Sequence, residues 1–237
     1  MAQIFHQGNF YGKLEVEVNK DNIRKALMPE LELIKDPDLR EKTVAAWALG
    51  CQMGGYERIE DIPSPGFAWV KITLLQHTKQ VTRIAAAILD VLGELGAERN
   101  RDHVLASALC HDVGVPLEIR NNKKGFHTPI MGAPRPGIFY GQNPDMPELE
   151  SGVSYQTARH STYGFYVTMA VGMPEHVAHI VGGHSREGDF FLRTPEATLI
   201  HYIDLLWWYE IGGWAYPTVP EWRGGEPFHW REGVEEA

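Results

Sequence analysis

The feature that most constrains the fold of this chain is a set of histidines and aspartates spread over segments predicted to be helical. The dipeptide His111-Asp112 closes one such helix, and the set comprises His77, His111, Asp112, His160, His184 and Asp204. Neutral imidazole nitrogens and carboxylate oxygens suit borderline or hard divalent cations such as Zn, Mn, Fe or Ni. A fold that uses these residues together must bring the ends of several helices to one point.

The periodic stretches of the sequence are helical in spacing. Apolar residues recur every three or four positions, and start and stop signals such as Gly54-Gly55 and Thr194-Pro195 bound the segments. The predicted helices cover residues 36–53, 68–95, 102–112 (with Asp102 as a candidate N-cap), 154–171, 174–185 and 195–210. No convincing strand pattern appears, although residues 9–18 weakly resemble one. We therefore expect a single all-α domain over residues 1–237, with its core at about 70–210.

Two segments break this pattern. Residues 116–153 contain many prolines and glycines, and a long irregular segment inside a compact domain is usually functional or disordered. Because it connects two helices with candidate ligands, we interpret it as a lid or pocket wall. From Ile211 onward the chain is an aromatic-rich, irregular tail, which makes a homodimer plausible.

Composition narrows the function classes. The net charge of −9 argues against nucleic acid as a partner, because basic residues supply most of the affinity for it. No apolar run is long enough to span a membrane, and no signal peptide is recognisable. Cys51 and Cys110 form no disulfide framework, so free thiols in a reducing compartment are the simple interpretation. These observations predict a cytoplasmic protein with a small-molecule substrate.

Three motifs resemble the HD-domain metal-dependent phosphohydrolase superfamily. They are LLQHTKQVTRIAAAIL from position 74, VLASALCHDVG from position 104 and HYIDLLWW from position 201. The first resembles the family's helix with the first ligand, the second its apolar helix ending in HD-x-G, and the third its helix with the final aspartate. The resemblance covers roughly residues 70–210. It implies an all-helical bundle and a hydrolase that uses a metal-activated water.

The resemblance also implies a ligand set for two divalent ions, with Mn, Fe, Zn and Ni as candidates. Members with dinuclear sites have additional histidines in the segments that contain His160 and His184. By that similarity, one metal would bind His77, His111, Asp112 and Asp204, and a second would bind Asp112, His160 and His184. A site with one metal is the alternative. In that case His160 and His184 would support the metal ligands or bind the substrate.

The chain departs from the family at one position. Many members have a lysine directly after HD-x-G, whereas this chain has Val115. The departure weakens the phosphodiester interpretation and the oxygenase branches that use that lysine, and it leaves room for a non-phosphate substrate. Alternatively, one or two of the basic residues around the lid replace the missing lysine. Lys123, Lys124 and Arg159 are the candidate substrate-binding residues, with solvated loop charges as the alternative. Asp112 and the proton-transfer candidate His127 are the predicted catalytic residues.

The predicted function is therefore a metal-dependent hydrolase of a small polar molecule. Its alternatives are a di-iron oxygenase of the same fold, a phosphohydrolase of a small phosphate ester or nucleotide, and a non-enzymatic sensor that keeps the pocket. Further histidines lie near the set on the same segments. We interpret His103 as structural, His176 and His179 as a solvated or hydrogen-bonded pair, and His201 as a packing residue or a support for Asp204.

Overall fold

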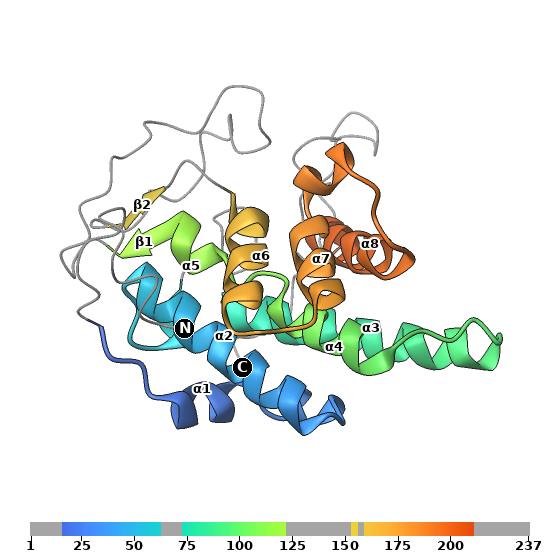
Figure 1. The fold of residues 1–237 in the computed structure, drawn as a ribbon, viewed down its shortest axis with the longest axis horizontal. Coiled ribbons are helices and arrows are strands. Elements are labelled where there is room, and N and C mark those ends of the chain that lie inside the picture. Colours follow the sequence, from blue (N-terminus) through green and yellow to red (C-terminus); the bar gives the residue numbers. More distant parts are fainter. Residues whose placement is uncertain (1–15, 63–72, 122–152, 156–158, 211–237) are drawn as a thin grey trace, which may run out of the picture.

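The computed structural model describes residues 16–62, 73–121, 153–155 and 159–210. Within these ranges the chain is a bundle of helices (Figure 1). The longer helices are α1 (Lys20–Leu27), α2 (Pro37–Gly54), α3 (Leu74–Glu94), α4 (Arg101–Cys110), α6 (His160–Ala170), α7 (Glu175–Gly183) and α8 (Pro195–Glu210). Shorter elements are α5 (Val115–Glu118) and the 3₁₀ turns Glu30–Leu33, Ile59–Asp61 and Arg186–Phe190. The all-α prediction is confirmed.

Local sequence signals set most of the helix ends. The Asp36 side chain accepts hydrogen bonds from the amides of Asp38 and Leu39 at the start of α2, and Gly55 ends that helix at φ 80°. Thr73 and Gln76 form a capping box at the start of α3. The predicted start of α8 is confirmed, because Thr194 Oγ1 accepts the amide of Ala197 at 3.2 Å.

The predicted cap of α4 is wrong. Asn100 caps this helix by accepting the His103 amide at 3.1 Å. Asp102 instead accepts the backbone amides of Lys35 and Asp36, each at 2.8 Å. Its carboxylate thereby connects the start of α4 to the segment that leads into α2.

Two predicted boundaries around the irregular segment are also wrong. The chain does not become irregular at residue 116, because Gly114 leads directly into α5 and then β1 (Ile119–Asn121). Residues 153–155 form strand β2 (Val153–Tyr155), antiparallel to β1, and the next helix begins at His160 rather than near Ser154. Most of the predicted lid (122–152), the tail (211–237) and most of the weak strand 9–18 lie outside the described residues.

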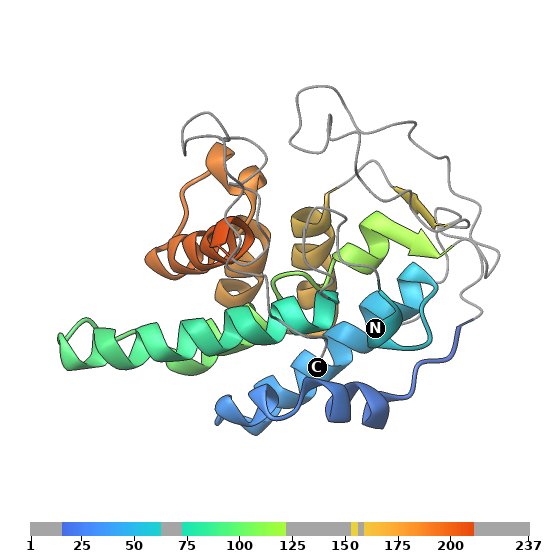
Figure 2. The same ribbon diagram turned by 180° about the vertical axis from the view of Figure 1, so that it is seen from behind.

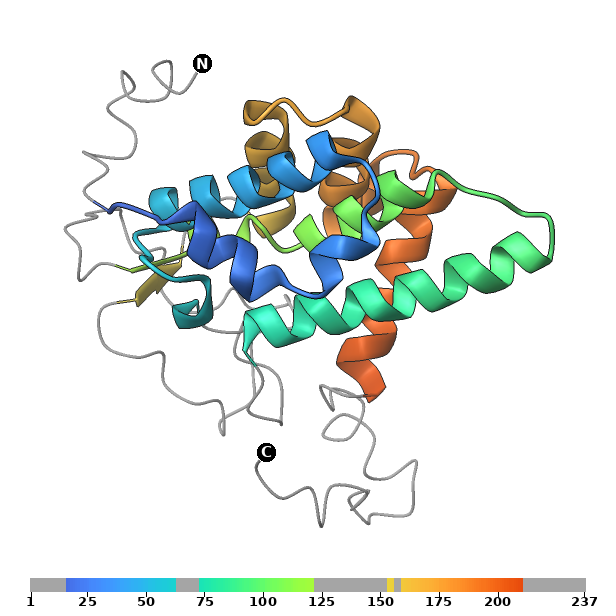
Figure 3. The same cartoon turned by 90° about the horizontal axis from the view of Figure 1, so that it is seen from below.

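One apolar core unites the described helices. Trp47 of α2 and Trp207 of α8 are fully buried, and the Trp47 Nε1 donates to the carbonyl of Leu109 at 2.7 Å. Seen from behind, α3 runs along one side of the bundle (Figure 2). Seen from below, α4 lies beside α3, and α8 crosses α3 (Figure 3). At this crossing Trp207 Nε1 of α8 donates to Oε1 of Gln80 in the second turn of α3, at 2.7 Å.

Two further expectations can be checked in the fold. Cys51 and Cys110 are buried and not in a disulfide, as the sequence predicted. Among the described residues, no helix combines the length and apolarity needed to cross a lipid bilayer.

Candidate metal centre

Six ligand-type side chains from five parts of the chain meet in the interior. α3 contributes His77, the turn after α4 contributes His111 and Asp112, the first residue of α6 is His160, the residue after α7 is His184, and α8 contributes Asp204. His77, His111 and His184 have no exposed surface, and Asp112 is 4% exposed. The structure therefore brings together the six side chains that the sequence analysis proposed as metal ligands.

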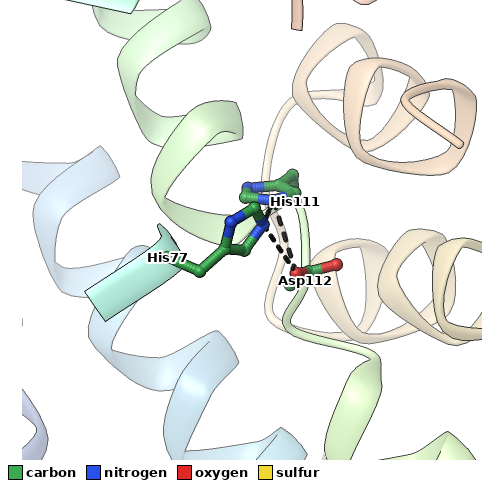
Figure 4. Close-up of side chains that lie close together, drawn as sticks. All are labelled: His77, His111 and Asp112. Atoms are coloured by element: carbon green, nitrogen blue, oxygen red, sulfur yellow. Dashed lines mark hydrogen bonds and ion pairs between the residues drawn. The ribbon is translucent and has the colours of Figure 1, made fainter. Parts of the chain in front are cut away.

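The first group of ligand atoms surrounds Nε2 of His77. This atom lies 3.0 Å from Nε2 of His111, 3.3 Å from Oδ2 of Asp112 and 3.1 Å from Oδ1 of Asp204. Figure 4 shows the His77 and His111 rings and the Asp112 carboxylate turned toward one another. Four potential donor atoms thus face one small volume.

The second group uses the other oxygen of the same aspartate. Oδ1 of Asp112 lies 3.6 Å from Nε2 of His160 and 3.6 Å from Nε2 of His184, and these two nitrogens are 3.3 Å apart. Asp112 therefore faces one pair of histidines with each carboxylate oxygen. This is the arrangement that a carboxylate bridging two cations requires.

The interatomic distances fit divalent cations. Ligands about 2.1 Å from a metal lie roughly 3.0–3.4 Å from one another in octahedral or tetrahedral geometry. The three distances from His77 Nε2 fall in this range, and His111 Nε2 lies somewhat farther, 3.7 Å, from Asp204 Oδ1. Among the described residues, His77 Nδ1 and Asp204 Oδ1 are buried without a hydrogen-bond partner. Orphaned buried polar atoms are unusual in a native interior, and a cation beside Asp204 would satisfy its Oδ1.

The ring orientations leave Nε2 available. Nδ1 of His111 lies 2.7 Å from the Ala108 carbonyl, and Nδ1 of His184 lies 2.6 Å from the Val181 carbonyl. A carbonyl only accepts, so Nδ1 of each ring must donate to it. Each Nε2 then faces the cluster with either a lone pair for a metal or a proton shared with a carboxylate.

Electrostatics favour anionic carboxylates in this buried cluster. Burial raises the pKa of the Asp112 carboxyl, but the charge and hydrogen bond of His111, with bonds from His184 and His77, hold it well below its usual range. Burial likewise opposes ionisation of Asp204, and the neighbouring His111 and His77 imidazoles overcome it and lower its pKa. Both carboxylates are therefore available as anionic ligands near neutral pH.

The imidazoles differ from one another. Burial lowers the pKa of His111, but Asp112 and Asp204 outweigh it and raise the pKa well above its ordinary value. The pKa of His160 is also raised, because Glu118 outweighs burial. The pKa of His184 is lowered, principally by burial. Of these three imidazoles, His184 is thus the one most readily kept neutral.

The structure adds a residue that the sequence prediction missed. Glu118, at the end of α5, is 7% exposed, and its Oε2 lies 2.8 Å from Nδ1 of His160. The only local sequence feature that could have indicated Glu118 is its position, as a single carboxylate at the end of the otherwise apolar run VPLE. Its partner lies 42 residues away, so no local pattern connects the two.

Of the three predicted substrate-binding residues, only Arg159 is described. It precedes His160, and its Nε lies 3.4 Å from a carboxylate oxygen of each of Glu118 and Glu187. Lys123, Lys124 and the proton-transfer candidate His127 lie outside the described residues. Val115, in the position of the family's lysine, is 1% exposed and belongs to the core.

The other histidines near the cluster bind backbone atoms or one another, and two tryptophans pack against His77. His201 Nδ1 lies 2.6 Å from the carbonyl of His184, so it contacts the backbone of that residue. His103 and His176 pair with each other at 3.2 Å, and His179 accepts the Thr194 amide. The rings of Trp207 and Trp208 lie against His77, with centroids 4.2 and 4.9 Å away, and form part of the wall of the site.

Comparison with known proteins agrees with this geometry. Residues 74–206, more than half of the chain, match the family described as HD domain. A dihydroneopterin 2′,3′-cyclic phosphate phosphodiesterase from Methanocaldococcus jannaschii is 28% identical over 117 residues, which cover 48% of this chain and 42% of that protein. No solved structure matches the chain significantly. The matched segment begins at α3 and ends in α8, so it contains all six ligand-type residues, and the chain belongs to the HD domain family of metal-dependent hydrolases.

Proposed function

We propose that this protein is a phosphohydrolase that cleaves a small phosphoester with the help of two divalent cations. The observation that carries the proposal is the position of Asp112, whose two carboxylate oxygens face two separate pairs of histidines. A single-metal site has no need for the second pair. The proposed ligands are His77, His111, Asp112 and Asp204 for one cation, and Asp112, His160 and His184 for the other.

Two cations in such a site would lower the pKa of a coordinated water and polarise the oxygens of a bound phosphoryl group. The chain's own residues orient these participants. Asp112 fixes the spacing of the two ligand groups, and the Ala108 and Val181 carbonyls fix the orientation of the His111 and His184 rings. Trp207 and Trp208 cover the His77 side and exclude bulk water there. The net reaction adds water to phosphorus and breaks one P–O ester bond.

The substrate class is also part of the proposal. The curated relative is named for a cyclic phosphodiester, and the alignment covers 42% of its length. We propose a small phosphodiester as substrate, with its negative charge met by the cations. Arg159, beside His160, is the proposed protein cation for the substrate, and Lys123, Lys124 and the proton donor His127 remain proposals of the same kind. The net charge of −9 supports a small molecule over nucleic acid.

The test is hydrolysis by purified protein loaded in turn with Mn²⁺, Fe²⁺, Zn²⁺ and Ni²⁺. The substrates are 2′,3′-cyclic nucleotides, bis-p-nitrophenyl phosphate and p-nitrophenyl phosphate, with p-nitrophenyl acetate as a non-phosphate ester. We expect metal-dependent cleavage of the diesters and its loss in Asp112→Asn. Cleavage of the acetate alone, or equal activity in Asp112→Asn, would contradict the proposal.

A di-iron oxygenase is the second candidate, because it also needs both His160 and His184 beside Asp112. Oxygen consumption by the iron-loaded protein in the presence of substrate candidates would favour it. Diester cleavage at the same rate with and without oxygen would favour the phosphohydrolase.

A further inference from the structure

The imidazoles of the cluster differ in the partner that binds Nδ1, the ring nitrogen that points away from the cluster. His111 and His184 are each held through Nδ1 by a neutral backbone carbonyl. His160 is held through Nδ1 by the Glu118 carboxylate. Within the described residues, His160 is thus the ring of the cluster whose outer partner is a side-chain anion.

Glu118 fixes the backbone of His160 as well as its ring. The same Oε2 that lies 2.8 Å from Nδ1 accepts the His160 backbone N–H at 2.6 Å. Arg159, at the N-cap of α6, makes no side-chain capping bond, so the Glu118 carboxylate satisfies the first amide of that helix. One buried carboxylate therefore sets both where α6 begins and how its first side chain is turned.

The charges of the two ligand groups explain why an anion is useful here. The group around His77 contains Asp204 in addition to the shared Asp112. The group of Asp112, His160 and His184 has only the shared carboxylate. A cation in the second group would therefore meet less negative charge, unless a neighbouring anion makes one of its imidazoles a stronger donor.

We propose that Glu118 is a positioning residue that gives the second ligand group its affinity for a cation. Its carboxylate makes the His160 ring a stronger electron donor to a cation, and it turns Nε2 of His160 toward Oδ1 of Asp112. Loss of such an outer partner typically costs about 10–100-fold in metal affinity. This inference rests on the proposed two-cation function and adds that the two cations depend on different supporting residues.

The test compares Glu118→Gln with Glu187→Gln. The first variant keeps the size and an acceptor oxygen but removes the charge next to His160. The second removes a partly buried charge that also lies 3.4 Å from Arg159 Nε, and its carboxylate bonds Ser161 rather than the imidazole. Metal-free protein is titrated with Mn²⁺ by calorimetry, and electron paramagnetic resonance is recorded after two equivalents.

Wild-type protein is expected to bind two Mn²⁺ and to show the spectrum of an exchange-coupled pair. In Glu118→Gln the weaker step loses about 10–100-fold in affinity, the tighter step stays within about twofold, and the isolated six-line Mn²⁺ signal replaces the coupled one. Glu187→Gln should match the wild type. Because the tighter step is measured on the same sample, it also reports that the variant is folded.

The inference is overturned if Glu118→Gln binds both cations as the wild type does, if it weakens both steps equally, or if Glu187→Gln has the same effect. These results differ from a failure of the proposed function. Wild-type protein that binds fewer than two Mn²⁺, or cleaves no phosphoester, would remove the function itself.

Discussion

Oδ2 of Asp112 lies 3.3 Å from Nε2 of His77, in the interior of the helical bundle. The other oxygen of the same carboxylate faces His160 and His184. Both ligand groups thus share one residue, placed in the turn between α4 and α5. A change at this residue should affect both groups at once.

The first prediction concerns that shared carboxylate. Asp112→Asn keeps the shape of the side chain but removes the charge that both groups use, so the variant should hold at most one cation. Its phosphoesterase activity should fall by more than the roughly 10–100-fold that loss of an outer partner costs. Metal analysis and initial rates measure these effects.

Asp102→Asn is the matched control for Asp112→Asn. Asp102 accepts the amides of Lys35 and Asp36 and touches no ligand. This change should cost about 1 kcal/mol of unfolding free energy and leave the metal content unchanged. Full activity in Asp112→Asn would refute the role given to that residue.

The second prediction concerns stability without metal. A cation that binds the folded chain alone stabilises it by about 2.7 kcal/mol when present at about 100 times its dissociation constant. For a chain of this size, that corresponds to roughly 5–11 °C in unfolding temperature. Chelator treatment followed by calorimetry should show the decrease, and Mn²⁺ should reverse it where Ca²⁺ does not. Identical melting curves before and after chelation would count against a buried site.

The third prediction follows from the pKa values of the imidazoles. The pKa values of His111 and His160 are raised, so in the metal-free protein these rings keep their protons to a higher pH than an ordinary imidazole does. Their contribution to metal-free stability is present below about pH 6.5 and is lost as pH rises through the raised values. Metal must displace the protons, so its affinity should increase with pH.

Calorimetry in buffers of different ionisation enthalpy should detect protons released when Mn²⁺ binds at pH 7. The thermal stabilisation by Mn²⁺ should also be larger at pH 8 than at pH 6. Binding without proton release, or stabilisation that declines as pH rises, would contradict the assignment of these rings as ligands.

The fourth prediction tests the close contact between α5 and α6. A Cβ placed on Gly114 would lie 1.9 Å from the carbonyl oxygen of His160 and 2.5 Å from the amide nitrogen of Gly164. Backbone atoms cannot rotate away, so Gly114→Ala should cost at least about 3 kcal/mol, the upper end for overpacking. Denaturant unfolding measures this loss.

Gly93→Ala is the matched control for Gly114→Ala. A Cβ on Gly93, near the end of α3, meets nothing within 4 Å, and its φ is negative. The change should stabilise the protein by about 0.5–1 kcal/mol. Gly114→Ala with wild-type stability would mean that α6 does not lie this close to Gly114.

The sequence predicted most of the helices, and it predicted the six histidines and aspartates that the structure brings together, from local patterns. The Thr194-Pro195 start of α8 and the glycine end of α2 are short-range signals, and the structure confirms them. The HD dipeptide and the resemblance of the other segments to the HD-domain family indicate which helices meet. These features need no knowledge of how distant segments pack.

The errors arise where distant residues determine the local structure. Asp102 accepts the two backbone amides just before α2, 66 and 67 residues away, instead of capping its own helix. The start of α6 at His160 depends on Glu118, 42 residues earlier, and on strand pairing between residues 119–121 and 153–155. Neither the cap nor the role of Glu118 can be predicted from a short window of sequence.

The most direct test of the central claim is the metal content of protein purified without chelator or affinity metal. Elemental analysis should find two divalent cations per chain, and Asp112→Asn should retain at most one. Protein that binds no transition metal, even after reconstitution with Mn²⁺, Fe²⁺, Zn²⁺ and Ni²⁺, would contradict the claim that these six side chains form a metal centre.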